Sequence, residues 1–294
     1  MTTLANMTEQ ILSELNSYVR NQDSLTVITQ PIGSTDLTWF VDDVSAVSKG
    51  TCEIGEELVY VKKVLPVDGQ IQILPGGRGW QATTAASHLV NSIIRNNPTF
   101  PRTQIMRAVN DTIKAIDLYV LANFDFSFDG TTMLYTLPED LVDVVGVTYE
   151  TKDSSGRWPT LNDFRLQFNH WPTGATAPRA AIELLSVPPA GYTVRVQYLK
   201  PASPISSTDD FSATGFPSSC EDMIRLGAMY RLVSTVDPGK LLANSVGADM
   251  LDQPVPAGRA SDVSKYLYQL FQARLAEEKA KQADNFDTII HYTG

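Results

Sequence analysis

The three histidines are the first residues whose side chains could perform acid–base or metal chemistry. His88, His170 and His291 are widely spaced, and none stands beside a serine or cysteine nucleophile within a recognisable motif. The H-x-x-x-H spacing, which places two imidazoles on one helix face for a metal ion, does not occur. We therefore expect surface or interface histidines. A triad assembled in space from distant residues stays open as the less favoured alternative.

Two short motifs invite a ligand-binding interpretation. Gly76-Gly77-Arg78-Gly79 is glycine-rich like a phosphate loop, but the Lys-Ser/Thr pair of a P-loop does not follow it. Residues 125–130, Asp-Phe-Ser-Phe-Asp-Gly, begin like a calcium loop, but Thr136 occupies the twelfth position, where an EF-hand has Glu. We interpret the first motif as a turn between strands. The second is structural, because its alternating phenylalanines are typical of a segment that packs one aromatic face.

Paired carboxylates could supply the acid and base that cleave a glycosidic bond. The acidic pairs of this chain are Asp42-Asp43, Glu139-Asp140, Asp209-Asp210 and Glu221-Asp222. They fall at expected turns and helix starts, where acidic side chains are favoured for capping and helix-dipole reasons. The tryptophans that could stack on sugars are Trp39, Trp80, Trp158 and Trp171. We predict no catalytic residue, no cofactor and no metal, and therefore a protein that is not an enzyme.

Composition narrows the class of protein further. The 294 residues are 43% hydrophobic and 19% charged, which is typical of a folded chain with a substantial core. The formal net charge of -10 argues against wrapping nucleic acid, because neutralising phosphates needs clustered Lys and Arg. Cys52 and Cys220 are too few and too far apart for a disulfide framework. Without a signal peptide or a membrane-spanning apolar run, we expect a soluble protein, made in a cytoplasm and in contact with no membrane.

Helical periodicity appears in four segments that must form the frame of the protein. Apolar residues at helical spacing, with capping residues such as Thr8 and the Ser218-x-x-Glu221 capping box, predict these helices. Their expected bounds are Thr8–Arg20, Pro101–Asn123, Ser218–Val236 and a last helix that begins near Ser261.

Strand signals fill the regions between these helices. β-Branched and aromatic residues predict strands at residues 25–29, 37–41, 57–65, 70–74, 133–137, 142–149, 181–186 and 192–199. Asp68-Gly69 predicts a hairpin between the third and fourth of them. No βαβ rhythm is present, so a doubly wound nucleotide-binding fold is not expected. We predict an α+β fold: a helical bundle built from distant segments, with two inserted β-rich blocks.

The expected domains follow from this division of the chain. We predict an N-terminal helix (1–24), a small β module (25–97), a helical core (98–123 and 216–283), an inserted β block with a loop (124–215) and a C-terminal tail (284–294). The tail resumes apolar character after a charged helix end, and its apolar residues are Phe286, Ile289, Ile290 and Tyr292.

Three segments together carry a family resemblance. One is the helix from Arg102 to Phe124, which leads to the turn Leu137-Pro138-Glu139-Asp140-Leu141 and a Val-rich strand. Another is the strand ending in Lys200-Pro201, followed by the helix from Ser218. The third, Gly50–His88, looks like a small β module of phage virion proteins, with Ala82 where that module usually has Gly. Together they resemble the head-to-tail adaptor proteins of tailed bacteriophages, also called connector or head-completion proteins.

The resemblance implies a role in assembly. Members form a ring, commonly of twelve subunits, beneath the portal protein in the virion neck, and contact tail, stopper or terminator proteins. DNA passes through the ring's channel without specific binding, which a negatively charged wall favours. The resemblance also implies that the C-terminal tail reaches the portal, so Phe286, Ile289, Ile290 and Tyr292 are the expected portal-binding residues. The protein would be made in the cytoplasm of the bacterial host.

Three alternatives remain open. The chain could be another virion component, such as a tail-tip, baseplate or collar protein, which would suit the β module but not the helices. It could be a carbohydrate-binding or hydrolytic virion protein, which the tryptophans and acidic pairs would serve. A cellular scaffold protein is the third alternative, and no positive feature favours it.

Overall fold

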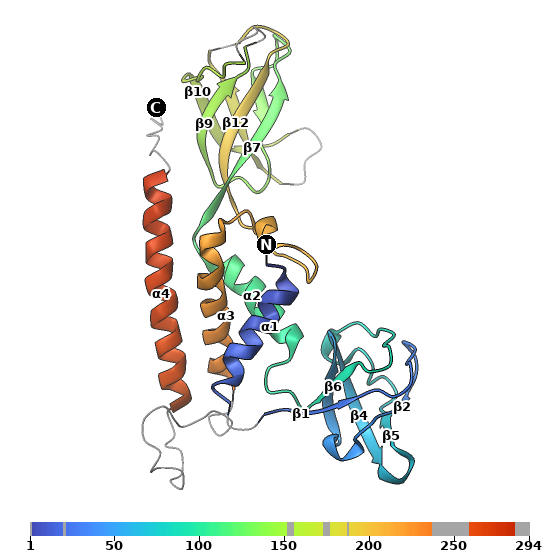
Figure 1. Cartoon of the computed structure of the whole chain (residues 1–294). Helices are drawn as coiled ribbons and strands as arrows, with labels where there is room; N and C mark the ends of the chain where they lie inside the picture. The colour runs from blue at the N-terminus through green and yellow to red at the C-terminus, as the bar shows by residue number, and fades with distance from the viewer. Residues whose placement is uncertain are drawn as a thin grey trace. The chain divides into compact units, whose positions relative to one another are not determined.

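The computed structural model describes residues 2–19, 22–151, 156–172, 177–186, 188–236 and 259–285 (Figure 1). Within these ranges the chain forms four α-helices and three β-sheets. It divides into two compact units. The first contains Met1–Thr112, Ile205–Phe211 and Glu221–Ala273, and the second contains Ile113–Pro204, Ser212–Cys220 and Arg274–Gly294. None of the described helices combines the length and apolar character needed to cross a bilayer.

A six-stranded antiparallel sheet forms the β part of the first unit. Its strands, in spatial order, are β1 (Ser24–Val27), β6 (Ile93–Asn96), β3 (Gly50–Ile54), β4 (Glu57–Leu65), β5 (Gln70–Ile73) and β2 (Thr38–Phe40). The sheet curls until its edges meet, because Ile28 bridges Val41 and the Thr29 N–H donates to the Phe40 carbonyl at 3.0 Å. Trp39 and eleven smaller apolar residues fill the interior.

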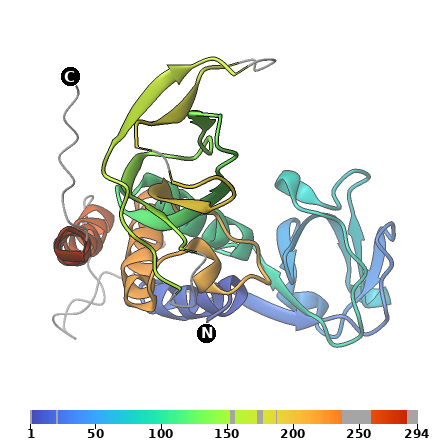
Figure 2. The same cartoon turned by 90° about the horizontal axis from the view of Figure 1, so that it is seen from above.

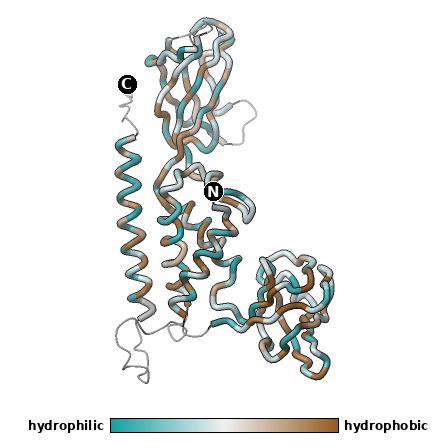
Figure 3. Tube along the Cα trace, viewed as in Figure 1, coloured by the Kyte–Doolittle hydropathy of each residue, from teal (hydrophilic) through white to brown (hydrophobic). Residues whose placement is uncertain are grey.

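The predicted strands of this sheet are confirmed within one or two residues at each end, and so is the hairpin at Asp68-Gly69. Gly69 has φ 64°, the left-handed conformation that this turn requires. β3 and β6 were not predicted, because Glu53 and Arg95 interrupt their apolar character. Figure 3 shows hydrophobic residues interspersed with hydrophilic ones in this sheet.

The helices of the first unit are α1 (Leu4–Asn16), most of α2 (Arg102–Ala115), α3 (Glu221–Thr235) and the first part of α4 (Arg259–Asn285). Helices α1, α2 and α3 lie side by side in both views (Figures 1 and 2). Thr3, not Thr8, caps α1, and the Thr8 hydroxyl instead donates to the Leu4 carbonyl inside the helix at 2.8 Å. The apolar stripe of α1 begins with Leu4 and Met7, a full turn before the predicted start.

Two antiparallel three-stranded sheets form the second unit. One has the order β7 (Tyr119–Ser127), β12 (Thr193–Pro201) and β9 (Asp143–Tyr149). The other has the order β10 (Phe164–His170), β11 (Arg179–Leu184) and β8 (Leu134–Thr136). Phe128, Leu137, Val147, Ile182 and Val196 are among the residues of the apolar core that both sheets share.

The predicted helical bundle is wrong, although the fold is α+β. Three sheets make up most of the folded architecture, and the helices accompany them. The error is clearest in the helix predicted over Pro101–Asn123, because α2 ends at Ala115 and β7 pairs with β12 along its whole length. Apolar residues four positions apart, as at Ile116, Val120 and Phe124, fit a strand's period of two as well as a helix. The division into separate domains stays a prediction.

Gly227 of α3 lies at a close contact with α2 and α4. A Cβ atom on Gly227 would lie 2.4 Å from Thr112 Cγ2 of α2 and 3.0 Å from Phe271 Cε2 of α4. The Thr112 hydroxyl is held by its hydrogen bond to the Ala108 carbonyl at 2.7 Å, which fixes the methyl group against Gly227. The helices of the first unit therefore meet where α3 has no side chain.

We expect Gly227→Ala to destabilise the protein by about 1–3 kcal/mol, because the added methyl overpacks this contact. Chemical denaturation of the full chain measures the free energy of unfolding. Gly146→Ala is the matched control, since a Cβ there would approach no closer than 3.8 Å, to Gln197 Oε1. Equal stability of the two variants would contradict this account of the packing.

Candidate functional site

The most completely bonded polar cluster of the described residues surrounds the carboxylate of Glu57, which is 1% exposed. Arg78 donates to both of its oxygens, from Nε at 2.7 Å and from Nη2 at 3.0 Å. The backbone N–H groups of Gly79 and Ala86 donate at 3.0 and 3.1 Å, and His88 Nε2 lies 2.8 Å from Oε2. Burial alone would raise the pKa of Glu57, but these hydrogen bonds lower it to about 2.

Arg78 has no free donor for a phosphate group. Its Nη1 donates to the carbonyls of Gly33 and Asp36 at 2.8 and 3.1 Å, and its Nη2 also donates to the Ala86 carbonyl at 2.6 Å. The guanidinium lies over the Trp39 ring, 4.9 Å from its centroid. The Gly76–Gly79 segment therefore binds the protein's own carboxylate, in keeping with the predicted turn rather than a phosphate loop.

The histidines are not brought together. His88 completes the Glu57 cluster, and His170 ends β10, where it is the cross-strand partner of Arg179. His291 lies outside the described residues. In the described part of the chain, no group of His, Cys, Asp or Glu side chains could hold a metal ion.

The carboxylate of Asp129, in the calcium-loop motif, accepts hydrogen bonds from residues of the turn that follows it. Its carboxylate accepts the N–H groups of Thr131 and Thr132 at 2.8 and 2.7 Å, together with both of their hydroxyls. The hydrogen bonds from Thr132 contribute most to lowering the pKa of Asp129. Asp125 instead forms a bidentate ion pair with Arg195 at 2.8 and 2.7 Å. The motif is a strand end followed by a turn, in agreement with the predicted structural role.

The acidic pairs lie at turns, helix starts and surface ion pairs. Asp43 and Asp209 accept hydrogen bonds from the backbone of Ser45 and Ser206, and Glu221 and Asp222 occupy the first turn of α3. Glu139 pairs with Arg179, while Asp140 lies 3.6 Å from Lys200. Asp43, Asp209, Glu139 and Asp140 are therefore engaged with their own turns or with neighbouring cations.

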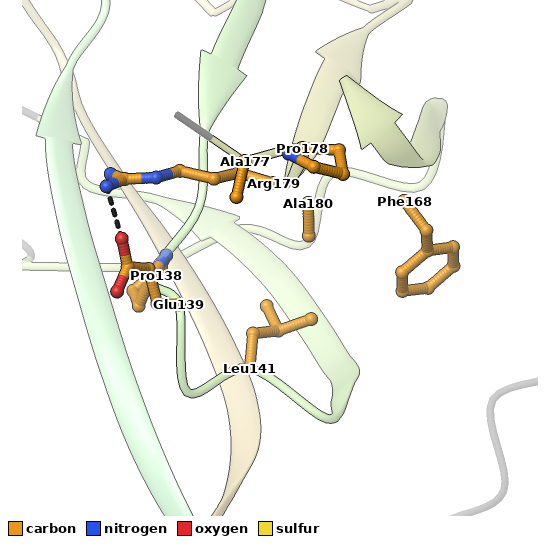
Figure 4. A pocket seen from close by; sticks show the side chains of 8 residues that line it. All are labelled: Pro138, Glu139, Leu141, Phe168, Ala177, Pro178, Arg179 and Ala180. Carbon is orange, nitrogen blue, oxygen red and sulfur yellow. Dashed lines mark ion pairs between the residues drawn. The ribbon is translucent and has the colours of Figure 1, made fainter. Parts of the chain in front are cut away.

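The pocket beside Glu139 has a volume of about 500 Å³ and lies on the β10–β11 sheet. Figure 4 shows the Glu139–Arg179 ion pair on one side of it, and Leu141, Phe168 and Ala180 on the other. The register of β10 and β11 shifts between Gln167 and His170, and Phe168, within this bulge, is 56% exposed. The lining combines the charged Glu139 and Arg179 with the apolar side chains of Pro138, Leu141 and Phe168, and it contains no Ser, Cys or His side chain.

The tryptophans are mostly used in packing. Trp39 is fully buried, Trp80 packs on Tyr60 with ring centroids 5.1 Å apart, and Trp158 lies under Arg195. Trp171, the fourth tryptophan, is 61% exposed.

Sequence reasoning missed a second buried carboxylate, Glu53 in β3, which is 0% exposed. It accepts from Arg95 Nη1 at 2.6 Å, Arg102 Nη1 at 2.9 Å and the backbone N–H of Arg102 at 2.5 Å. Burial raises the pKa of Glu53, although both guanidinium groups oppose the rise. The sequence signal for this buried carboxylate was a single acidic residue between Cys52 and Ile54, in a segment rich in strand-forming residues.

Glu278 of α4 is a third such carboxylate, within the second unit. It is 4% exposed and accepts from Lys281 Nζ at 2.6 Å and from the Ser219 hydroxyl at 3.1 Å. Burial acts to raise its pKa, but these bonds lower it overall. Its spacing from Phe271 and Leu275 places it on the buried stripe of the helix, which was the signal in the sequence.

The cysteines are not reactive nucleophiles. Both are buried, and burial raises the pKa of Cys52 to about 11 and that of Cys220 to about 12. Glu278, 3.6 Å from the Cys220 sulfur, adds to the second rise. Because the thiolate is the nucleophile, neither side chain suits covalent catalysis.

We expect Glu57→Gln to destabilise the protein by about 3–5 kcal/mol, because Arg78 would remain buried without its counter-charge. The pKa of about 2 lies below the usual 4.5, so the ionised carboxylate stabilises the fold fully above pH 4.5. That contribution is lost as the pH falls from 4.5 towards 2. Denaturant titrations at several pH values should show this acid loss in the wild type but not in Glu57→Gln. Glu56→Gln, at the exposed neighbour, is the control; an equal acid loss in Glu57→Gln would contradict the assignment.

Comparison with known proteins identifies the family. A family model described as the SU10 adaptor protein matches residues 82–289, which include the second unit's sheets, α2, α3 and α4. No curated protein matches the chain. The family match confirms the resemblance to phage adaptors, while a place in the head-to-tail connector stays a prediction. The match spans more than half of the chain, and the protein therefore belongs to the SU10 adaptor protein family, a family of phage adaptors.

Proposed function

We propose that this protein is a structural, non-enzymatic subunit of the phage virion neck. It assembles into a ring, commonly of twelve copies in such adaptors, that joins the portal protein to a tail, stopper or terminator protein. The observation that carries this proposal is the match of residues 82–289 to an adaptor family. The structural use of the candidate catalytic groups described above supports a role in assembly rather than in catalysis.

The surface supports assembly with other subunits. In the second unit, Leu121, Met133, Val142, Phe168, Trp171 and Leu185 are between 40% and 61% exposed. In the first unit, Tyr266, Tyr268 and Leu270 of α4 are between 36% and 55% exposed. Exposed apolar side chains favour contacts with other protein surfaces where they lie close enough together to form a patch. A closed ring needs two different complementary faces on each copy, and these two groups are the candidates.

The charge of the protein supports a channel that does not retain DNA. The net charge is -10, and many of the arginines already face carboxylates. The arginines in ion pairs are Arg78, Arg95, Arg102, Arg179, Arg195, Arg225 and Arg274. Cations engaged in this way contribute little to phosphate binding, so a passing duplex would be repelled rather than held.

The portal-binding tail belongs to this proposal. Phe286, Ile289, Ile290 and Tyr292 lie outside the described residues. The support comes from the sequence, because an apolar segment after the charged end of α4 suits docking on a partner by pocket filling or strand addition.

We expect the purified protein to form rings, alone or on added portal rings, and to bind short duplex DNA weakly even at low salt. Native mass spectrometry and negative-stain imaging measure the assembly, and fluorescence anisotropy measures the DNA binding. A monomer that ignores the portal would contradict the ring, and tight DNA binding would contradict the non-binding channel.

Replacing Ile289 and Ile290 together by Asp should abolish capture of the protein by immobilised portal rings, because charged side chains would have to enter an apolar contact. Thr288→Asp, in the same segment, is the matched control and should retain most of the binding. Undiminished capture of the double variant would contradict the role of the tail without affecting the ring.

A further inference from the structure

We propose that Glu53 and Arg102 form a latch that fixes the orientation of the six-stranded sheet on helices α1 and α2. Glu53 lies in β3, and Arg102 is the first residue of α2. All the groups involved belong to the first unit. The latch is a conformational device within one subunit, and it does not depend on the ring proposed above.

Arg102 joins the sheet to both helices at one point. Its backbone N–H donates to Glu53 Oε1 at 2.5 Å and its Nη1 to Glu53 Oε2 at 2.9 Å. The other side of the same guanidinium binds Glu9 of α1, from Nε at 2.5 Å and from Nη2 at 3.2 Å. Glu53 therefore supplies the negative charge at the start of α2, where the helix dipole favours it, and Arg102 extends the link to α1.

Arg95 ties the chain connections into the same cluster. The sheet is joined to α1 through residues 17–23 and to α2 through residues 97–101. Arg95 donates to Glu53 at 2.6 Å and also pairs with Asp23, in the first connection. Asp23 in turn accepts the N–H of Thr99, in the second connection, at 3.2 Å. Asp23 and Thr99, one residue from each connection, are thus bonded within the cluster that holds Arg102.

Burial differs along this chain of charges, so salt reaches the Arg102–Glu9 pair more readily than the bonds to Glu53. Glu53 and Arg95 are 0% and 6% exposed, so their ion pair is shielded from solvent and stays formed. The side chains of Arg102 and Glu9 are 25% and 55% exposed, so salt and competing groups can reach their pair. A further link, from Arg107 Nη2 to the Gln81 carbonyl at 3.3 Å, is a single hydrogen bond. Without the Arg102 side chain, the guanidinium bonds to Glu53 and Glu9 would be lost, while the backbone N–H bond to Glu53 and the Arg107 bond would remain. The orientation of the sheet would then be held less tightly.

Spin labels on the sheet and on α1 test the latch in the full chain. Lys63→Cys in β4 and Ser13→Cys in α1 provide exposed labelling positions, while the buried native thiols of Cys52 and Cys220 react slowly. Pulsed electron paramagnetic resonance then measures the distribution of distances between the two spin labels. In Arg102→Ala we expect this distribution to become about twofold broader, as for a hinge whose fixing contact is removed. High salt should broaden the wild-type distribution in the same direction.

Lys114→Ala, at the other end of α2, is the matched control and should leave the distribution unchanged. Amide exchange of β3 and β4 reports whether the sheet itself stays folded. An unchanged distribution in Arg102→Ala would overturn the proposal. Loss of β3 and β4 protection in Arg102→Ala would also overturn it, because the pair would then stabilise the sheet rather than its orientation. Glu53→Gln should show the same broadening. If Glu53→Gln unfolds, the measurement on Arg102→Ala decides the test, because Arg102 is more exposed.

Discussion

A buried carboxylate must be fully paired, and this requirement organises the first unit. An ionised carboxylate loses several kcal/mol or more when it leaves water, unless cations and hydrogen-bond donors replace the solvent. Glu53 and Glu57 are both enclosed by the protein, only four positions apart in the chain. Each binds an arginine. Arg78, in the glycine-rich loop, binds Glu57 of the sheet, and Arg102, at the start of α2, binds Glu53. Two charged side chains in neighbouring strands thus decide where a loop and a helix must lie.

The exposed acids of the protein follow a different rule, which explains why the motifs of the sequence do not amount to a site. Asp43, Asp129 and Asp209 bind the backbone and hydroxyl groups of their own turns. Such local bonds satisfy the carboxylate within two or three residues and leave no converging set of groups for a substrate. Other exposed acids, such as Asp125 and Glu139, each pair with a single arginine, whereas the buried Glu53 and Glu57 each bind several donors. The surface also exposes several large apolar side chains, among them Phe168 and Trp171.

Local patterns in the sequence predict local structure here and little beyond it. The strands around Trp39 and Val59 are recognisable because β-branched and aromatic residues alternate between turn residues. β7 was mistaken for the end of a helix, since its even-numbered apolar residues fit both periods and only pairing with β12 decides between them. Glu53 and Arg102 are 49 positions apart, and no periodicity connects them. The family could be recognised from segments, whereas the balance between sheet and helix depends on which segments pair.

Two kinds of contact hold the first unit together, and they respond differently to conditions. The helices meet through Gly227, where apolar groups approach so closely that the contact has one arrangement and is insensitive to salt. The sheet meets α1 and α2 through Arg102, where the contact is directional, partly hydrated and screened by ions. A rigid group of helices joined to a sheet by a polar contact can keep one set of interfaces fixed while another adjusts. In the ring proposed above, where the subunit would contact partners on two sides, that division of rigidity would be a physical advantage. This difference in rigidity arises because Gly227 lies at the contact between the helices, whereas Arg102 lies at the contact between the sheet and the helices.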